Sequence, residues 1–148
     1  MRLAEAIEGA RLVIVAGVRS PQGNVSLLKE FVANGGQLLV AAGGEFSASA
    51  WQEHAWLDGD GIIPARLTGN TIGTTPDETQ GELAPKLLAF DSVAKNELLR
   101  LPGVSSDLLA DLYAEVLFFK AVEIDESQEN ASNARVIARL ESTEGPPL

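Results

Sequence analysis

Residues 31–44 constrain the fold more than any other part of the chain. They are Phe31-Val-Ala-Asn-Gly-Gly-Gln-Leu-Leu-Val-Ala-Ala-Gly-Gly44. The first part is typical of a helix that ends at Gly35 and Gly36, because glycine readily adopts the left-handed conformation that closes a helix. The apolar run from Gln37 to Ala42 is typical of a buried strand, and the glycines after it indicate a sharp corner. The stretch therefore predicts a helix, a strand and a turn in close succession.

A second apolar run, Arg11-Leu-Val-Ile-Val-Ala-Gly17, precedes this stretch. It is continuous rather than alternating, which is typical of a parallel strand buried on both faces. Between the two runs, Ser20-Pro21 predicts a helix start, with serine as the N-cap and proline at the first helical position. A strand, a helix and a strand within about 30 residues predict a βαβ unit.

The remaining segments give further expectations about secondary structure. Asp58 to Gly61 and the polar residues Thr68 to Gly81 are expected to be loops, the second a surface excursion. Two late runs, Tyr113 to Ile124 and Ala134 to Leu140, predict an antiparallel hairpin around the polar loop 125–133. We also expect a short helix end over 3–8, a short helix over 46–56, a strand over 86–90, and a helix capped by Ser105 or Ser106 that runs through Leu112.

Composition excludes several classes of protein. The chain has 148 residues, of which 45% are hydrophobic and 22% charged, as in ordinary globular domains, so we expect one domain over residues 1–148. Its net charge of -10 argues against binding nucleic acid or anionic lipid, both of which need clustered basic residues. Because it has no cysteine, disulfides and thiol catalysis are excluded. No apolar run approaches the ~20 residues of a membrane span, so we expect the chain itself to be soluble.

The glycine corner is the first candidate site. In α/β enzymes with a nucleophile elbow, a reactive side chain stands at such a strand-to-helix turn between small neighbours. Here Gly43 and Gly44 supply the small neighbours, but the position near Ala42 holds no nucleophile. Backbone amides there could still bind an anion or carboxylate, which makes Ala42, Gly43, Gly44 and Glu45 candidates for binding; the alternative is a plain structural turn. We expect no catalytic residue, metal or cofactor in this chain.

Polar residues beyond the corner suggest two further sets. Ser47, Ser49 and His54 resemble part of a catalytic triad, but a triad needs its base from another element, so an ordinary helix with Trp51 packed inward is the simpler interpretation. Asp58-Gly-Asp-Gly61 resembles the start of a calcium loop, but Ile62 occupies the third ligand position, so the match fails. A carboxylate-dependent hydrolase would need two of four acidic residues to converge in a pocket: Glu45, Glu53, Asp58 and Asp60.

The order of these signals resembles the class I glutamine amidotransferase-like domain. The likeness is to the non-catalytic version found in large bacterial membrane proteins, which carry an aerotolerance-regulator-type N-terminal membrane segment and a von Willebrand factor A domain. It covers most of the chain and rests on the order of five stretches: residues 10–17 with Ser20-Pro21, 27–40, Gly61-Ile-Ile-Pro-Ala-Arg-Leu67, 116–122 and 134–140.

The resemblance implies a fold and a setting. The fold would be a flavodoxin-like three-layer α/β sandwich, with a mostly parallel sheet between helices and a late antiparallel hairpin. The setting would be a membrane-anchored parent with this domain outside the cytoplasm, from which the present chain would be an excised part. In the catalytic relatives a cysteine at the elbow works with a histidine and a glutamate. This chain lacks the cysteine near Ala42 and a late His-x-Glu, which excludes glutaminase activity.

Three functions are consistent with these patterns. The first is a non-catalytic interaction or sensing module whose partners are proteins or other domains of the membrane-associated parent; an uncovered sheet edge would also allow a homodimer. The second is a stand-alone domain that binds a small ligand or carbohydrate at the corner after Ala42. The third is the carboxylate-dependent hydrolase.

Overall fold

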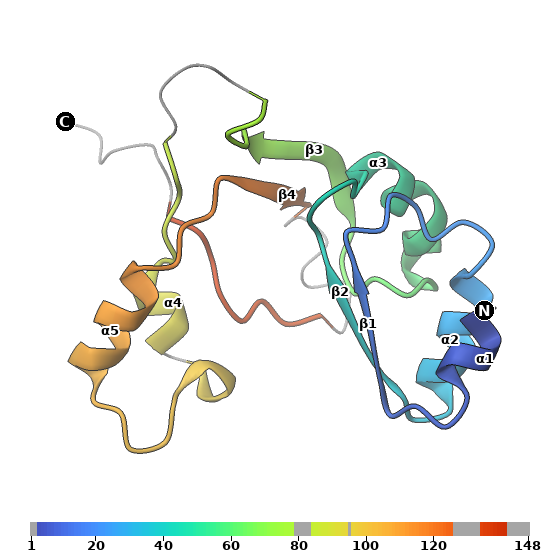
Figure 1. The fold of residues 1–148 in the computed structure, drawn as a ribbon, viewed down its shortest axis with the longest axis horizontal. Helices are drawn as coiled ribbons and strands as arrows, with labels where there is room; N and C mark the ends of the chain where they lie inside the picture. Colours follow the sequence, from blue (N-terminus) through green and yellow to red (C-terminus); the bar gives the residue numbers. More distant parts are fainter. Residues whose placement is uncertain (1–2, 79–83, 95, 126–133, 142–148) are drawn as a thin grey trace. The chain divides into compact units, whose positions relative to one another are not determined.

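The computed structural model describes residues 3–78, 84–94, 96–125 and 134–141, and these form a mixed α/β fold (Figure 1). The chain divides into two compact units. The first unit combines residues 1–71 with 122–134, and the second combines residues 72–121 with 135–148. The elements in chain order are α1 (Leu3–Ile7), β1 (Leu12–Ala16), α2 (Val25–Ala33), β2 (Gln37–Ala41), α3 (Ala48–Trp51), the π-helix η1 (Gln52–Trp56), the 3-10 helix η2 (Leu57–Gly59), β3 (Leu67–Gly73), α4 (Phe90–Ala94), the 3-10 helix η3 (Glu97–Leu99), α5 (Ser106–Ala114) and β4 (Lys120–Ile124).

The first unit contains the predicted parallel strand pair. Strands β1 and β2 are paired in parallel, with Leu12 opposite Gln37 and Ala16 opposite Ala41, and α2 connects them. The helices of this unit lie on one face of the pair (Figure 1). The prediction of a strand, a helix and a parallel strand is therefore confirmed. The expectation that both strands are buried on both faces is wrong, because residues along each strand alternate between half-buried and exposed.

The core of the first unit forms around Trp51. Its side chain is 0% exposed and clusters with Ala55 and Ile63, while Val15 and Val40 pack against this cluster from the sheet. The indole Nε1 donates a hydrogen bond of 2.8 Å to the Val18 carbonyl, which satisfies its one polar atom. The core thus joins the helical segment after β2 to the covered face of the sheet.

The glycine pair ends α2 as predicted. The Gly35 N–H donates to the Val32 carbonyl at 2.9 Å, and the Gly36 N–H donates to the Phe31 carbonyl at 3.0 Å, which together form a Schellman motif. Gly35 has φ +89°, the left-handed conformation that this motif needs. Gly36 also gives space to the Phe31 ring, which a Cβ at this position would displace.

The start of α2 differs from the prediction. The helix begins at Val25, and its N-cap is Asn24 rather than Ser20. Ser20 instead accepts a hydrogen bond from the Gln22 N–H at 3.2 Å, and the Asn24 N–H donates to the Pro21 carbonyl at 2.9 Å. These bonds form a turn before the helix. Serine followed by proline favours turns as well as helix starts, so the local pattern did not distinguish the two.

The second unit is built around α4, η3 and α5. Ser105 caps α5, as predicted, and its hydroxyl accepts a hydrogen bond from the Leu108 N–H at 3.3 Å. The Tyr113 hydroxyl donates to the Leu99 carbonyl at 2.8 Å, which ties α5 to η3. Buried apolar side chains of this unit include Val93 and Leu109.

The predicted late hairpin is wrong. Tyr113 belongs to α5, and the strand in this region, β4, covers only Lys120–Ile124. Residues 134–139 form no strand, and Leu140 makes an isolated antiparallel bridge to Leu88. The alternation in both segments indicated one covered face, but alternation does not specify which strand pairs with which. Residues 126–133 of the expected loop lie outside the described residues.

Strand β4 pairs instead with β3, in the segment expected to be a surface excursion. The Asp125 N–H donates to the Arg66 carbonyl at 2.9 Å. Gly73, near the other end of β3, lies so close to the Phe119 carbonyl oxygen that a Cβ would approach it to 2.2 Å, so the pair is antiparallel. Glycines with positive φ at Gly69 and Gly73 obscured the strand in the sequence, since glycine is uncommon in strands. Residues 79–81 of the expected excursion lie outside the described residues.

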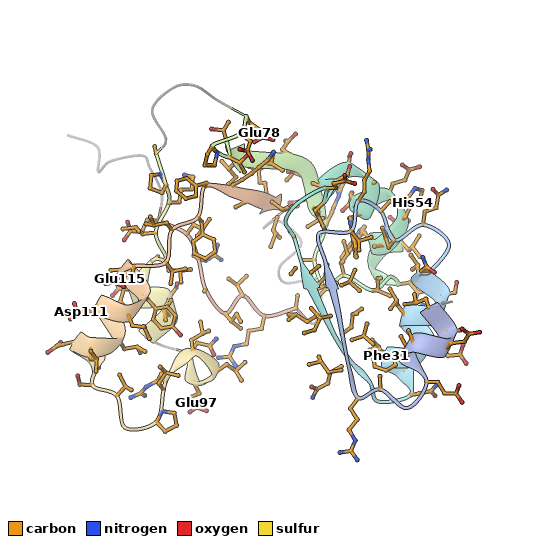
Figure 2. All side chains as sticks on the ribbon, in the orientation of Figure 1. Phe31, His54, Glu78, Glu97, Asp111 and Glu115 are labelled. Atoms are coloured by element: carbon orange, nitrogen blue, oxygen red, sulfur yellow. The ribbon has the colours of Figure 1, made fainter. Side chains whose placement is uncertain are left out.

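One ion pair in the second unit gives a pH-dependent prediction. The Lys120 ammonium donates to the Glu78 carboxylate, which also accepts a hydrogen bond from the Thr75 N–H at 3.0 Å (Figure 2). These interactions, the bond from Lys120 first, lower the pKa of Glu78 from 4.5 to about 2. The stabilisation is therefore present above pH 4.5 and is lost as the pH falls toward 2.

We expect Lys120→Met to raise the pKa of Glu78 from about 2 toward 4.5, although the hydrogen bond from the Thr75 N–H remains; an NMR titration of the glutamate carboxyl carbons measures this shift. Lys29→Met, which removes the partner of Asp60, is the matched control and should leave the pKa of Glu78 unchanged. A Glu78 pKa near 2 in the Lys120→Met variant would show that Lys120 is not the cause.

Candidate functional site

The glycine corner lies where the carboxyl ends of β1 and β2 meet. The Gly17 N–H donates to the Ala41 carbonyl at 3.1 Å, and a Cβ on Gly17 would lie 3.1 Å from the Gly43 carbonyl oxygen. The Ser47 N–H donates to the Arg19 carbonyl at 3.2 Å, which closes the corner further. The backbone of residues 17–19, which follows β1, therefore packs directly against the backbone of the corner.

The four predicted binding residues, Ala42 to Glu45, are exposed on this corner. The helix that follows offers little to an anion, because α3 is only four residues long and Ser47 already caps it. The Ser47 hydroxyl accepts a hydrogen bond from the Ala50 N–H at 3.4 Å. This geometry favours the structural turn over the binding corner.

The serines and the histidine beyond the corner form no catalytic pair. The hydroxyl oxygens of Ser47 and Ser49 lie 3.2 Å from each other. His54 projects from η1, and its Nε2 lies 3.9 Å from a carboxylate oxygen of the adjacent Glu53 (Figure 2). Among the described residues, no hydrogen bond joins His54 to either serine, so the structure positions no base against a nucleophile.

The four acidic residues of the hydrolase hypothesis are not joined by any described interaction. Glu45 lies on the corner, Glu53 in η1 and Asp58 in η2, while Asp60 forms an ion pair of 2.7 Å with Lys29. Within residues 3–78, 84–94, 96–125 and 134–141, no three Asp, Glu or His side chains are grouped to hold a metal ion. The structure therefore gives the hydrolase hypothesis no support.

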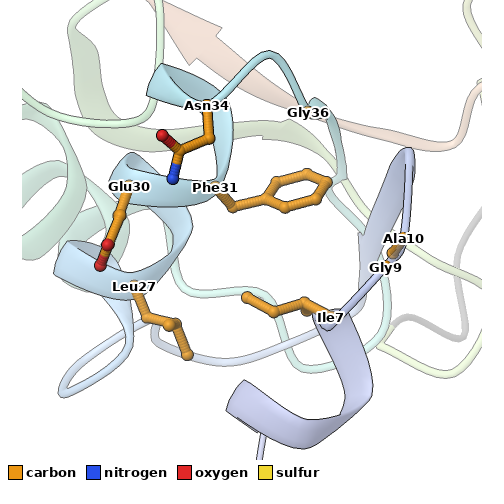
Figure 3. A pocket seen from close by; sticks show the side chains of 8 residues that line it. All are labelled: Ile7, Gly9, Ala10, Leu27, Glu30, Phe31, Asn34 and Gly36. Atoms are coloured by element: carbon orange, nitrogen blue, oxygen red, sulfur yellow. The ribbon is translucent and has the colours of Figure 1, made fainter.

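A cavity of about 350 Å³ lies between α1 and α2, away from the glycine corner (Figure 3). Sequence reasoning did not find it. The only signal is the spacing of Leu27, Glu30 and Phe31, at i, i+3 and i+4, which places them in one stripe along α2. The residues that line the cavity are Ile7, Gly9, Ala10, Leu27, Glu30, Phe31, Asn34 and Gly36.

The second feature missed by sequence reasoning is the face of the β1–β2 pair opposite the helices, which we call the open sheet face. It consists of the six exposed residues of the two strands: Leu12, Ile14, Ala16, Gln37, Leu39 and Ala41. All of them except Gln37 are apolar. Its large side chains are well exposed, at 51% for Leu12, 58% for Ile14 and 52% for Leu39. The other two residues are Ala16 and Ala41, both exposed. Parallel sheets are normally covered on both faces, so an apolar face left open is unusual.

No family model, curated protein or solved structure matches the chain. In the part of the chain that the structure describes, no helix has the length and apolar character needed to cross a membrane. Among the described residues, the cavity and the open sheet face are the features that we use to propose a function.

Proposed function

We propose that the chain is a non-catalytic interaction or sensing module of a larger, membrane-associated bacterial protein. The open sheet face is the observation that supports this proposal. Three large aliphatic side chains from two adjacent strands, Leu12, Ile14 and Leu39, remain about half exposed. Covering exposed apolar area stabilises by roughly 25 cal/mol per Å², so this face favours contact with another apolar surface.

The dimensions of the face fit a helix. Two strands of five residues each measure about 16 Å by 10 Å, at about 3.3 Å per residue and 4.8 Å between strands. A helix of about 11 residues has the same length. We propose that such a helix, from another domain of the parent or from a protein partner, packs against Leu12, Ile14 and Leu39. It would add a third layer to the β1–β2 pair, in line with the flavodoxin-like three-layer sandwich that the resemblance implies.

The proposed setting is tested by the size and location of the native polypeptide. An antibody raised against residues 1–148 should detect, in fractionated cells, a band much larger than 15.6 kDa in the membrane pellet. Washing the pellet with high salt should leave that band in place, whereas detergent should release it. A band near 15.6 kDa in the supernatant would contradict a membrane-anchored parent.

A second candidate function is small-ligand binding, which the cavity between α1 and α2 favours. Its volume of about 350 Å³ falls within the range of roughly 300–1,000 Å³ typical of ligand pockets. The four residues of the predicted site, Ala42 to Glu45, are exposed on a turn. If this chain binds a small molecule, the geometry favours the cavity over the corner.

A further inference from the structure

We infer that the cavity between α1 and α2 binds a small ligand that carries a protonated amine on an apolar body. This inference goes beyond the proposed interaction module; it rests on the second candidate function and names the chemistry of its ligand. It uses a different part of the first unit from the open sheet face, so either proposal can fail without the other.

Small residues keep the cavity open. Gly9 and Ala10 form one wall, where the chain passes from α1 into β1. Gly36 forms another, and the Phe31 ring packs directly over it: a Cβ at Gly36 would lie 2.3–2.6 Å from three atoms of that ring. The Phe31 ring therefore lies against Gly36, where a larger side chain would compete with it for space.

The apolar part of the lining comes from both helices. The Ile7 side chain, at the end of α1, extends toward Leu27 on α2, and the Phe31 ring, one turn after Leu27, extends toward Gly36 (Figure 3). All three side chains are half-buried. A hydrocarbon or aromatic group placed against them would be partly removed from water, and burial of apolar area is the main source of affinity in such sites.

The polar part of the lining selects a cation. Glu30, on α2, and Asn34, the C-cap residue of α2, are exposed at the rim and supply a carboxylate and a carboxamide oxygen, which accept hydrogen bonds. No lysine, arginine or histidine lines the cavity. The one basic residue of α2, Lys29, forms an ion pair with Asp60, whereas Glu30 has no ion-pair partner among the described residues. An ammonium group fits these acceptors, and the Phe31 ring offers it a further favourable contact.

The inference is tested by an NMR titration of the isotope-labelled chain with 2-phenylethylamine, which is protonated at pH 7. The neutral analogue 2-phenylethanol is the matched probe. We expect chemical-shift changes concentrated in residues 7–10 and 27–36, and about fivefold weaker binding of the alcohol. That factor corresponds to an exposed ion pair worth up to about 1 kcal/mol.

Three variants make the test specific. Glu30→Gln should weaken binding of the amine about fivefold and leave binding of the alcohol unchanged. Glu53→Gln, another exposed glutamate of the same unit, should change neither. Ala10→Leu, which fills the cavity, should abolish both. Equal affinity for the two probes, unchanged amine binding in Glu30→Gln, or no shifts in these segments would overturn the inference.

Discussion

Trp51→Ala should lower the free energy of unfolding by about 3–5 kcal/mol, the range for removing a buried tryptophan or phenylalanine. Trp51 is fully buried, packs against Ala55 and Ile63, and stacks on Phe46 with ring centroids 5.1 Å apart. Its removal would leave a cavity in the core and an unpaired carbonyl at Val18. Small domains have only about 5–15 kcal/mol of stability in total, so the loss would be a large fraction of it.

Urea unfolding followed by circular dichroism measures this loss. Trp56→Ala is the matched control. Because Trp56 is only half-buried, this variant should lose clearly less stability. Trp51→Phe should lose an intermediate amount, because it keeps an aromatic ring but removes the hydrogen bond to Val18, which is worth about 0.5–1.5 kcal/mol. A loss below about 1 kcal/mol in Trp51→Ala would show that this core is not the one that stabilises the first unit.

Gly61→Ala should also be strongly destabilising, by at least about 2 kcal/mol, because the added methyl group would overlap with backbone rather than with a movable side chain. A Cβ at Gly61 would lie 1.7 Å from the Ala55 carbonyl oxygen and 2.7 Å from that of Trp56. Both carbonyls accept hydrogen bonds from this segment, from the N–H groups of Ile62 at 2.8 Å and of Gly61 itself at 2.9 Å. Relief of the overlap would break these bonds.

Gly43→Ala is the control for this prediction. A Cβ at Gly43 would meet nothing within 4 Å, and Gly43 does not have a positive φ, so thermal unfolding should change little. If Gly61→Ala and Gly43→Ala unfold at the same temperature, the close approach of residues 55–56 to Gly61 is not present in solution.

Local sequence signals predicted the first unit well. The apolar runs over β1 and β2, and the paired glycines that end α2, act within a few residues of one another. Each therefore specifies its element without help from distant parts of the chain. Ser105 predicted the start of α5 for the same reason.

Long-range pairing was not predictable in the same way. Strand β3 joins β4 across about 50 residues of sequence, and the alternation in residues 134–140 fitted a strand that does not form. The cavity between α1 and α2 was missed because it results from the lack of large side chains at Gly9, Ala10 and Gly36. An apolar stripe on a helix does not show whether the space beside it is filled.

The most direct test of the proposed interaction module is photo-crosslinking from the open sheet face in intact cells. A benzophenone amino acid at Ile14 should join the chain to one discrete polypeptide, or to one discrete segment of its own parent, identified by mass spectrometry. The same group at Glu53, exposed on the helical side of the unit, should yield no such product. A discrete product from Ile14 alone would support the open sheet face as the contact surface. No product from Ile14, or the same products from both positions, would contradict it.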